Sequence, residues 1–328
     1  MRTRALLPLF AIVLAVAGCD AGSSAKRVAT APMRWFGDKE KDPHEKAKSD
    51  RDKVNAKDAK DAAEASANSP YQKAQRLTEA GEYKKAIPLW EKIVEEQPRN
   101  DEALRYLGDC KYNIEQFDEA VDCYKRARKL NPNNYLALRD WGFTELNAGH
   151  AVLKEGKPDA AMERYAESLR LLREANKVFA GDSDAVYGRA LAANGASQLV
   201  AAQARQLKER NDDIREAEKR RDQCLDLCSE GIEAASFRIN RKVNEPGPRA
   251  LVANLFKRRA DLLYAFGRLP EAIDAAQLSQ RSWQSIVKEI DKNEKGAAQF
   301  HEKAKQELAS IEITLRDWRA KNAGAVSQ

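Results

Sequence analysis

The sequence is poor in the residues that form tight turns and in those that carry most enzyme chemistry. Only 16 glycines and 11 prolines occur among 328 residues, which argues against an all-β architecture with its many turns. The three histidines, His44, His150 and His301, are far apart in sequence. No H-x-x-x-H, C-x-x-C or glycine-rich phosphate loop is present, and no serine has a nucleophile-elbow context. We therefore expect no enzyme, no metal and no cofactor.

An excess of charge of one sign is also missing. The chain has 57 Lys and Arg against 51 Asp and Glu, a formal net charge of +6, and the two signs are interleaved. This pattern lacks the basic footprint of a nucleic-acid-binding protein, so no nucleic-acid partner is expected. Charged residues make up 33% and hydrophobic residues 43%, with much alanine, glutamate and leucine, which favours a helical protein with a core.

Long apolar runs are absent except near the N-terminus, from Ala5 to Ala17. Basic residues precede this run, and it is shorter than the roughly 20 residues of a membrane-spanning helix, so residues 1–18 are predicted to be a signal peptide. The run ends in Val16-Ala17-Gly18-Cys19, which resembles the lipobox of bacterial lipoproteins. The resemblance implies cleavage before Cys19, a diacylglycerol on its thiol and the lipid bilayer as a partner. The alternative is an ordinary signal peptide with an incidental cysteine.

Residues 19–69 are predicted to be the lipidated cysteine and a disordered charged tether. Between Lys39 and Glu64 there are eight basic and eight acidic residues and almost no aliphatic ones, too little apolar surface to offset chain entropy. A coil of this length spans about 40 Å. A binding peptide around Trp35-Phe36 is the alternative.

Asp20 resembles an inner-membrane retention signal, but the choice between inner and outer membrane stays open, with the body in the periplasm or extracytoplasmic space.

From Pro70 onward two segments superimpose at a spacing of 34 residues. Small residues, aromatic residues and prolines recur at matching positions, and the pairs are Tyr83 and Phe117, Ala86 and Ala120, Trp90 and Tyr124, Ile93 and Ala127, and Pro98 and Pro132. This pattern, with Leu104, Leu107-Gly108 in the second unit and Leu138, Trp141-Gly142 in the third, resembles the tetratricopeptide repeat family. The resemblance implies an all-α solenoid of antiparallel helical hairpins, in which Gly108 and Ala120 allow close helix approach.

Beyond residue 133 the pattern loosens. We expect repeats one to three over 70–182, an extended irregular hairpin over 183–245, and a further repeat-like hairpin with a capping helix over 246–322, followed by a disordered tail at 323–328. Within these ranges, 205–222 is charged and predicts a solvated hairpin tip. Two sets of apolar residues are predicted to pack within the chain: a seam at 225–239 with a spacing of three and four residues, and a stripe on the terminal helix from Phe300 to Trp318. Docking of a partner helix on that stripe is the alternative.

Four cysteines remain after Cys19. Cys110 and Cys123 lie on successive helices of one hairpin, at similar distances from its turn, so a disulfide is permitted; the alternative is that both are small buried core residues. Cys224 and Cys228 are one turn apart on one helix, which disfavours a bond between them.

The family resemblance implies a concave groove lined by the first helix of each repeat. Its predicted lining residues are Tyr71 and Gln75 in the first unit, Arg105, Asp109, Tyr112 and Asn113 in the second, and Arg139, Phe143 and Asn147 in the third. Arg105 and Arg139 are 34 residues apart, so two guanidinium groups beside aromatic rings are expected to hold the carboxylate of a protein or extended peptide. A local Arg105–Asp109 pair on a solvated face is the alternative.

The predicted function is a membrane-anchored scaffold for protein assembly or secretion in the bacterial cell envelope. Two other classes stay open: a peptidoglycan- or polysaccharide-binding module, which would favour exposed aromatic stripes, and a homo-oligomeric structural protein that associates through the 225–239 seam. The partner and the oligomeric state are not fixed by the sequence.

Overall fold

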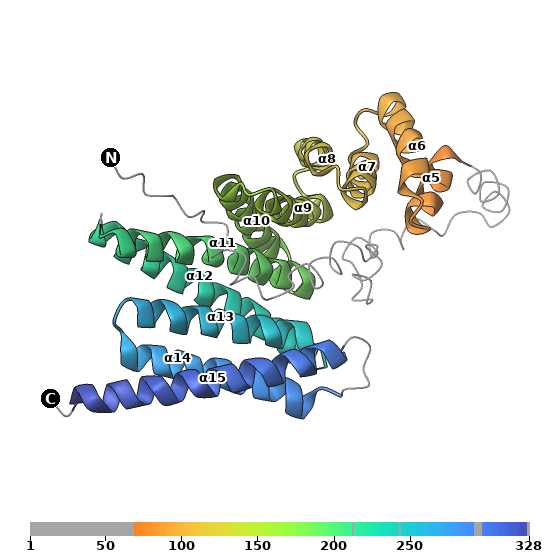
Figure 1. Cartoon of the computed structure of the whole chain (residues 1–328). Helices are drawn as coiled ribbons and strands as arrows, with labels where there is room; N and C mark the ends of the chain where they lie inside the picture. The colour runs from red at the N-terminus through yellow and green to blue at the C-terminus, as the bar shows by residue number, and fades with distance from the viewer. Residues whose placement is uncertain (1–68, 212, 243, 292–296, 327–328) are drawn as a thin grey trace. The chain divides into compact units, whose positions relative to one another are not determined.

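The computed structural model describes residues 69–211, 213–242, 244–291 and 297–326 (Figure 1). Within these ranges the chain is helical and has no strand, so the predicted all-α class is confirmed. No helix in the described ranges is both long and apolar enough to cross a membrane. The predicted signal peptide, Cys19 and the tether lie outside the described residues. The described chain divides into two compact units, 69–147 and 148–326, with the division inside one helix.

The first unit consists of short helices that pair as hairpins. They are α5 (Pro70–Glu79), α6 (Tyr83–Glu96), α7 (Asp101–Asn113), α8 (Phe117–Leu130) and the first part of α9 (Tyr135–Lys154). The 34-residue period reappears in the helix starts: Asn100 Oδ1 accepts a hydrogen bond from the Ala103 amide at 2.9 Å, and Asn134 Oδ1 accepts one from Ala137 at 2.9 Å. Each asparagine satisfies an amide that the helix leaves without a partner. Pro98 and Pro132 lie in the turns that precede these caps.

Aromatic side chains fill the space between the hairpins of this unit. The Trp90 ring stacks on Tyr106 with centroids 4.9 Å apart, and Tyr71 meets Trp90 edge-on at the same separation. In the next hairpin a Cβ built on Gly108 would lie 2.8 Å from Cε1 of the buried Tyr124 ring. The predicted close approach of the two helices at Gly108 is therefore present. The Tyr124 ring on α8 occupies the space that a side chain at position 108 of α7 would fill.

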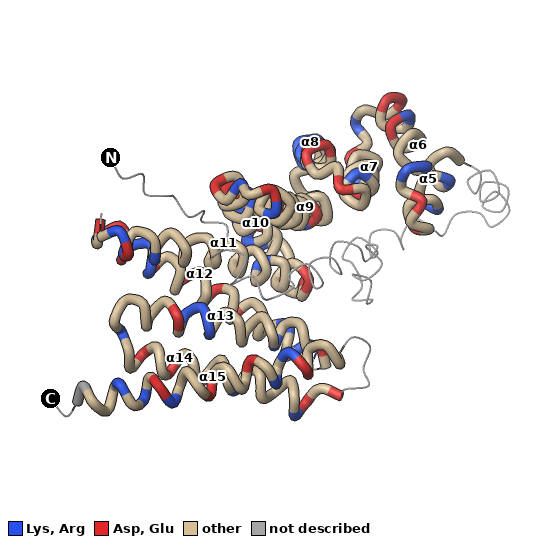
Figure 2. The backbone as a smooth tube through the Cα atoms, viewed as in Figure 1, with Lys and Arg blue, Asp and Glu red and all other residues tan. Residues whose placement is uncertain are grey.

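The second unit has longer helices. They are the end of α9, α10 (Pro158–Val178), α11 (Ser183–Arg210), α12 (Ile214–Arg241), α13 (Pro246–Ala265), α14 (Leu269–Glu289) and α15 (Ala297–Val326). Tyr165 on α10 is fully buried, and Cβ atoms built on Gly149 and Gly195 would lie 2.7 and 2.8 Å from its ring. Two glycines on neighbouring helices thus accommodate one aromatic ring. Both acidic and basic residues occur along these helices (Figure 2).

The apolar seam and stripe of the second unit are covered within the chain. The 225–239 seam packs with residues of α11 and α13 in one core cluster, so its apolar face is internal. The α15 residues Ile311, Leu315 and Trp318 pack with α13 and α14 in another. The stripe of the terminal helix therefore has its packing partner within the chain.

Two local features of this unit differ from the sequence prediction. The charged tip is not wholly solvated: the Lys208 ammonium lies 4.7 Å from the centroid of the Phe266 ring, and Arg221 lies 5.3 Å from it. Helix α15 continues to Val326 rather than ending at residue 322, since the alanines among its last residues are strong helix formers.

Candidate functional site

The predicted groove residues of α7 and α9 form a compact ionic cluster. Arg105 NH1 donates to Asp109 Oδ2 at 2.7 Å and lies 3.9 Å from Asp140 Oδ2. Arg139 Nε donates to Asp140 Oδ1 at 2.9 Å, and the Tyr124 hydroxyl donates to Asp109 Oδ1 at 2.8 Å. The structure thus brings the two arginines together, as their 34-residue spacing predicted.

This ionic cluster is buried rather than offered to a partner. Arg105 is 9% exposed, Asp109 4% and Asp140 1%. Burial disfavours the charge on Arg105, but the Asp109 and Asp140 carboxylates outweigh it and raise the pKa of the guanidinium. Two arginines and two aspartates cancel in charge, so the chain itself supplies carboxylates to Arg105 and Arg139. That these arginines hold the carboxylate of a partner stays a prediction. The alternative Arg105–Asp109 pair is the one observed, although it is buried rather than on a solvated face.

The aromatic residues expected beside the arginines are buried too. Tyr112 and Phe143 are 5% and 4% exposed, and the Asn147 amide donates to the Tyr112 hydroxyl at 2.7 Å. The remaining predicted lining residues are only partly buried and hydrogen-bond or pack locally: Asn113 with the Asp109 carbonyl, Gln75 with Glu79, and Tyr71 with Trp90. Their role as a binding surface stays a prediction.

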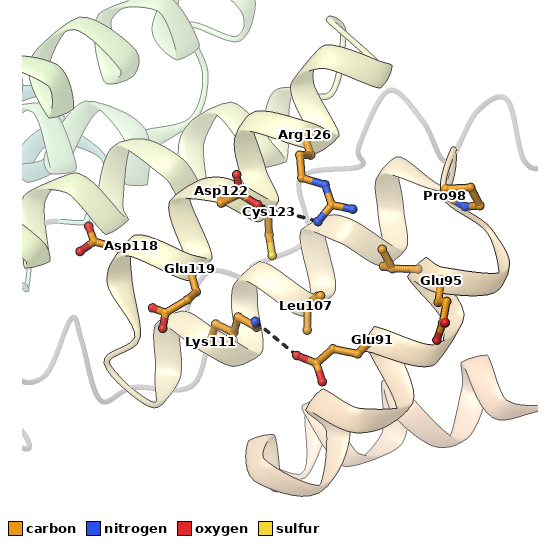
Figure 3. Close-up of a pocket in the computed structure, with 11 residues that line it drawn as sticks. Glu91, Glu95, Pro98, Leu107, Lys111, Asp118, Glu119, Asp122, Cys123 and Arg126 are labelled. Atoms are coloured by element: carbon orange, nitrogen blue, oxygen red, sulfur yellow. Dashed lines mark ion pairs between the residues drawn. The ribbon is translucent and has the colours of Figure 1, made fainter.

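The opposite face of α7 forms the floor of a hollow (Figure 3). Leu107 and Lys111 are each offset by two residues, about 200° around the helix, from Arg105 and Asp109. The hollow has a volume of about 730 Å³ and lies between α6 and α8. Its lining residues are Glu91, Val94, Glu95, Pro98, Leu107, Lys111, Asp118, Glu119, Asp122, Cys123 and Arg126. We call it the α6/α8 groove.

The α6/α8 groove combines an apolar floor with acidic walls. Val94, Leu107 and Cys123 are 7%, 4% and 3% exposed, whereas the acidic side chains are exposed. Five acidic and two basic residues line it, a formal charge of −3. Both bases are paired inside the groove: Lys111 Nζ lies 3.3 Å from Glu91 and Arg126 NH1 lies 3.8 Å from Asp122. The groove is therefore suited to bind cations beside a small apolar group.

The four cysteines within the described ranges, Cys110, Cys123, Cys224 and Cys228, are free, buried thiols. The permitted Cys110–Cys123 disulfide is not formed because the two side chains have different surroundings: Cys110 Sγ lies 3.3 Å from the Thr78 hydroxyl, and Cys123 faces the α6/α8 groove. Burial raises the pKa of Cys110 to about 12 and that of Cys123 to about 11. Both are neutral at physiological pH, which leaves them poor nucleophiles.

The two histidines in the described ranges hold structural positions. His150 Nδ1 lies 2.7 Å from the Tyr165 hydroxyl, and burial lowers the pKa of the imidazole to about 4. His301 Nε2 is 2.8 Å from the Ile290 carbonyl oxygen and 2% exposed. The described residues contain no group of three His, Cys, Asp or Glu side chains placed to hold a metal.

Sequence reasoning missed Asp140 and the whole α6/α8 groove. Asp140 directly follows Arg139, and that adjacency was the available signal for a second internal carboxylate. The sequence pattern that could have indicated the groove is the spacing of acidic residues on the second helix of each hairpin. They lie at 91 and 95 in one hairpin and at 118, 119 and 122 in the next. On each helix this spacing places the acids on one face.

Comparisons with known proteins agree with this description of the repeats. Residues 77–141 match the family model of the tetratricopeptide repeat, which confirms the resemblance for that segment. Comparison with curated proteins gives no match.

Solved structures with a similar fold include MamA, residue 41 to the end, from Desulfovibrio magneticus RS-1. It is 17% identical, the alignment covers 63% of this chain and 93% of that one, and the TM-score is 0.43. YrrB, described as a tetratricopeptide protein with an unusual peptide-binding site, is 16% identical over 68% of this chain and 91% of that one, with a TM-score of 0.39. A tetratricopeptide repeat protein from Parabacteroides merdae is 16% identical over 76% and 97%, with a TM-score of 0.30.

Proposed function

We propose that the chain is a lipid-anchored protein of the bacterial envelope whose helical repeats hold a partner protein for assembly or secretion. The observation that carries the interaction role is the packed repeat unit at 69–147, which contains the tetratricopeptide match at 77–141. Hairpins stacked in this way expose extended surfaces on fixed helices, which is how repeat proteins bind partners.

The anchor rests on the N-terminal sequence alone. The apolar run before Val16-Ala17-Gly18-Cys19 supports lipidation, and acyl chains give stable membrane binding when two or more are attached. A Cys19→Ser variant should lose incorporation of labelled palmitate and leave the membrane fraction of cells. Membrane retention of a protein that incorporates no palmitate would contradict the anchor without affecting the interaction role.

Binding rather than catalysis is supported by the places of the titratable groups. His150 and His301 are each engaged in an internal hydrogen bond, and the described cysteines are buried. Wall binding has less support, because among the described aromatic side chains only Tyr264 is exposed, at 36%, and it stacks on Trp318 at 4.5 Å.

The interaction role is tested by crosslinking in intact cells, followed by purification of the tethered protein and mass spectrometry of the proteins recovered with it. The expected result is a defined envelope protein, recovered in constant ratio and absent when an unrelated lipoprotein is purified in the same way. Recovery of no specific protein, together with sedimentation of the purified chain with peptidoglycan, would replace the scaffold by wall binding.

A further inference from the structure

We infer that the α6/α8 groove is the docking site for a basic segment of the partner protein, in which lysine or arginine side chains flank a small aliphatic one. The inference rests on the proposed function and adds the chemistry of the partner. It also moves the binding site from the buried Arg105 face of α7 to the opposite face of the same helix.

The shape of the groove supports a peptide side chain as occupant. Its volume of about 730 Å³ lies within the range of roughly 300 to 1,000 Å³ that is usual for ligand pockets. Val94, Leu107 and Cys123 provide an apolar floor at its base. An aliphatic side chain placed there would remove apolar surface from water, whereas a fully polar ligand would leave that floor unused.

The charge of the groove selects the sign of the partner. The whole chain has a formal charge of +6, yet the groove has −3. Glu91 and Asp122 are ion-paired with the two basic residues of the groove. Glu95 on α6 and Glu119 on α8 form no ion pair within the described part of the chain. These two exposed carboxylates come from the two helices that flank the groove, so both of its walls carry unpaired negative charge. An acidic segment would be repelled from both walls.

The test uses the full chain with Cys19→Ser and two fluorescein-labelled peptides of 12 residues. In one peptide lysine alternates with valine, leucine and serine, and in the other glutamate replaces every lysine. Fluorescence anisotropy measures binding of each. We expect the lysine peptide to bind and the glutamate peptide not to bind, with the affinity of the lysine peptide falling as NaCl is raised from 50 to 500 mM, because salt screens exposed charges.

Two groove variants give opposite expected effects. Glu95→Lys with Glu119→Lys should weaken binding of the lysine peptide roughly tenfold, since two attractions become repulsions. Arg126→Glu should instead strengthen it by about threefold, a gain that misfolding would not produce. The control is Glu79→Lys with Glu96→Lys, two exposed acids of the same unit outside the groove, which changes the charge equally and should leave the affinity within about twofold of the parent.

Equal affinity for both peptides would overturn the inference, as would equal weakening by the groove and control variants. A self-association of the parent that the groove variant abolishes, seen by analytical ultracentrifugation, would overturn it in favour of a second copy of the chain. In cells, a partner captured by the parent and retained by the groove variant leaves the proposed function standing and removes only the inference. Capture of no partner by the parent removes the proposed function, whatever the peptides do.

Discussion

Replacing Gly108 by alanine should destabilise the first unit even though alanine is the better helix former. The added methyl carbon would lie 2.8 Å from Cε1 and 2.9 Å from Cζ of Tyr124. That ring is fully buried, and its hydroxyl is fixed by the 2.8 Å bond to Asp109, so it cannot swing away cheaply. Overpacking of a core costs about 1–3 kcal/mol, whereas alanine gains about 1 kcal/mol over glycine within a helix. The net expectation is a loss of up to about 2 kcal/mol.

The assay is equilibrium urea unfolding of the Cys19→Ser chain, followed by circular dichroism. Gly324→Ala on α15 is the matched control, since a Cβ there meets nothing within 4 Å. That variant should be unchanged or more stable by up to about 1 kcal/mol. A Gly108→Ala chain as stable as the parent would show that the glycine is not required for the approach of α7 and α8.

Two further predictions concern protonation and thiols. Burial lowers the pKa of His150 to about 4, below the value near 6.5 of an unfolded chain. The unfolded state therefore binds more protons between pH 6.5 and 4, and stability should fall by up to about 3 kcal/mol as the pH falls through this window. A His150→Gln chain should have a flatter pH dependence of its urea midpoint, and an unchanged slope would contradict this assignment. In urea without reductant, a thiol-reactive dye should label four cysteines per Cys19→Ser chain; a count of two would indicate a disulfide. The expected sites are Cys110, Cys123, Cys224 and Cys228.

The repeats were predictable because their residues act locally and recur. Turn prolines mark helix ends wherever they occur, and Gly108 and Tyr124 indicate a helix contact within one hairpin. The end of α15 was harder to predict, since residues 323–326 contain no proline and a single glycine is tolerated within a helix. The partial cover of the charged tip depends on Phe266, which is more than 40 residues away in sequence, so no local pattern could reveal it.

The candidate site was less predictable, because a sequence pattern places residues around a helix but does not report their burial. The spacing of Arg105 and Arg139 correctly placed them near each other. Whether such a pair is open to a ligand depends on the carboxylates that surround it, and Asp140 completes a neutral cluster. This limits the choice of variants. Substituting both arginines by glutamate would place four carboxylates together in a buried site and unfold the unit, so the double glutamate variant could not test binding.

The contact between glycine and tyrosine shows how this solenoid can change its length. Gly108 contacts Tyr124, and Gly149 contacts Tyr165; the partners are 16 positions apart in sequence in each case. The two contacts are 41 residues apart rather than 34, a difference of seven residues, which is close to two turns of helix. Such an insertion rotates the downstream part of the helix by only about 20°, so the tyrosine ring still packs against a glycine of the neighbouring helix. Helices of this architecture can therefore grow in steps of two turns, whereas an insertion of two or five residues would turn the packing face toward solvent.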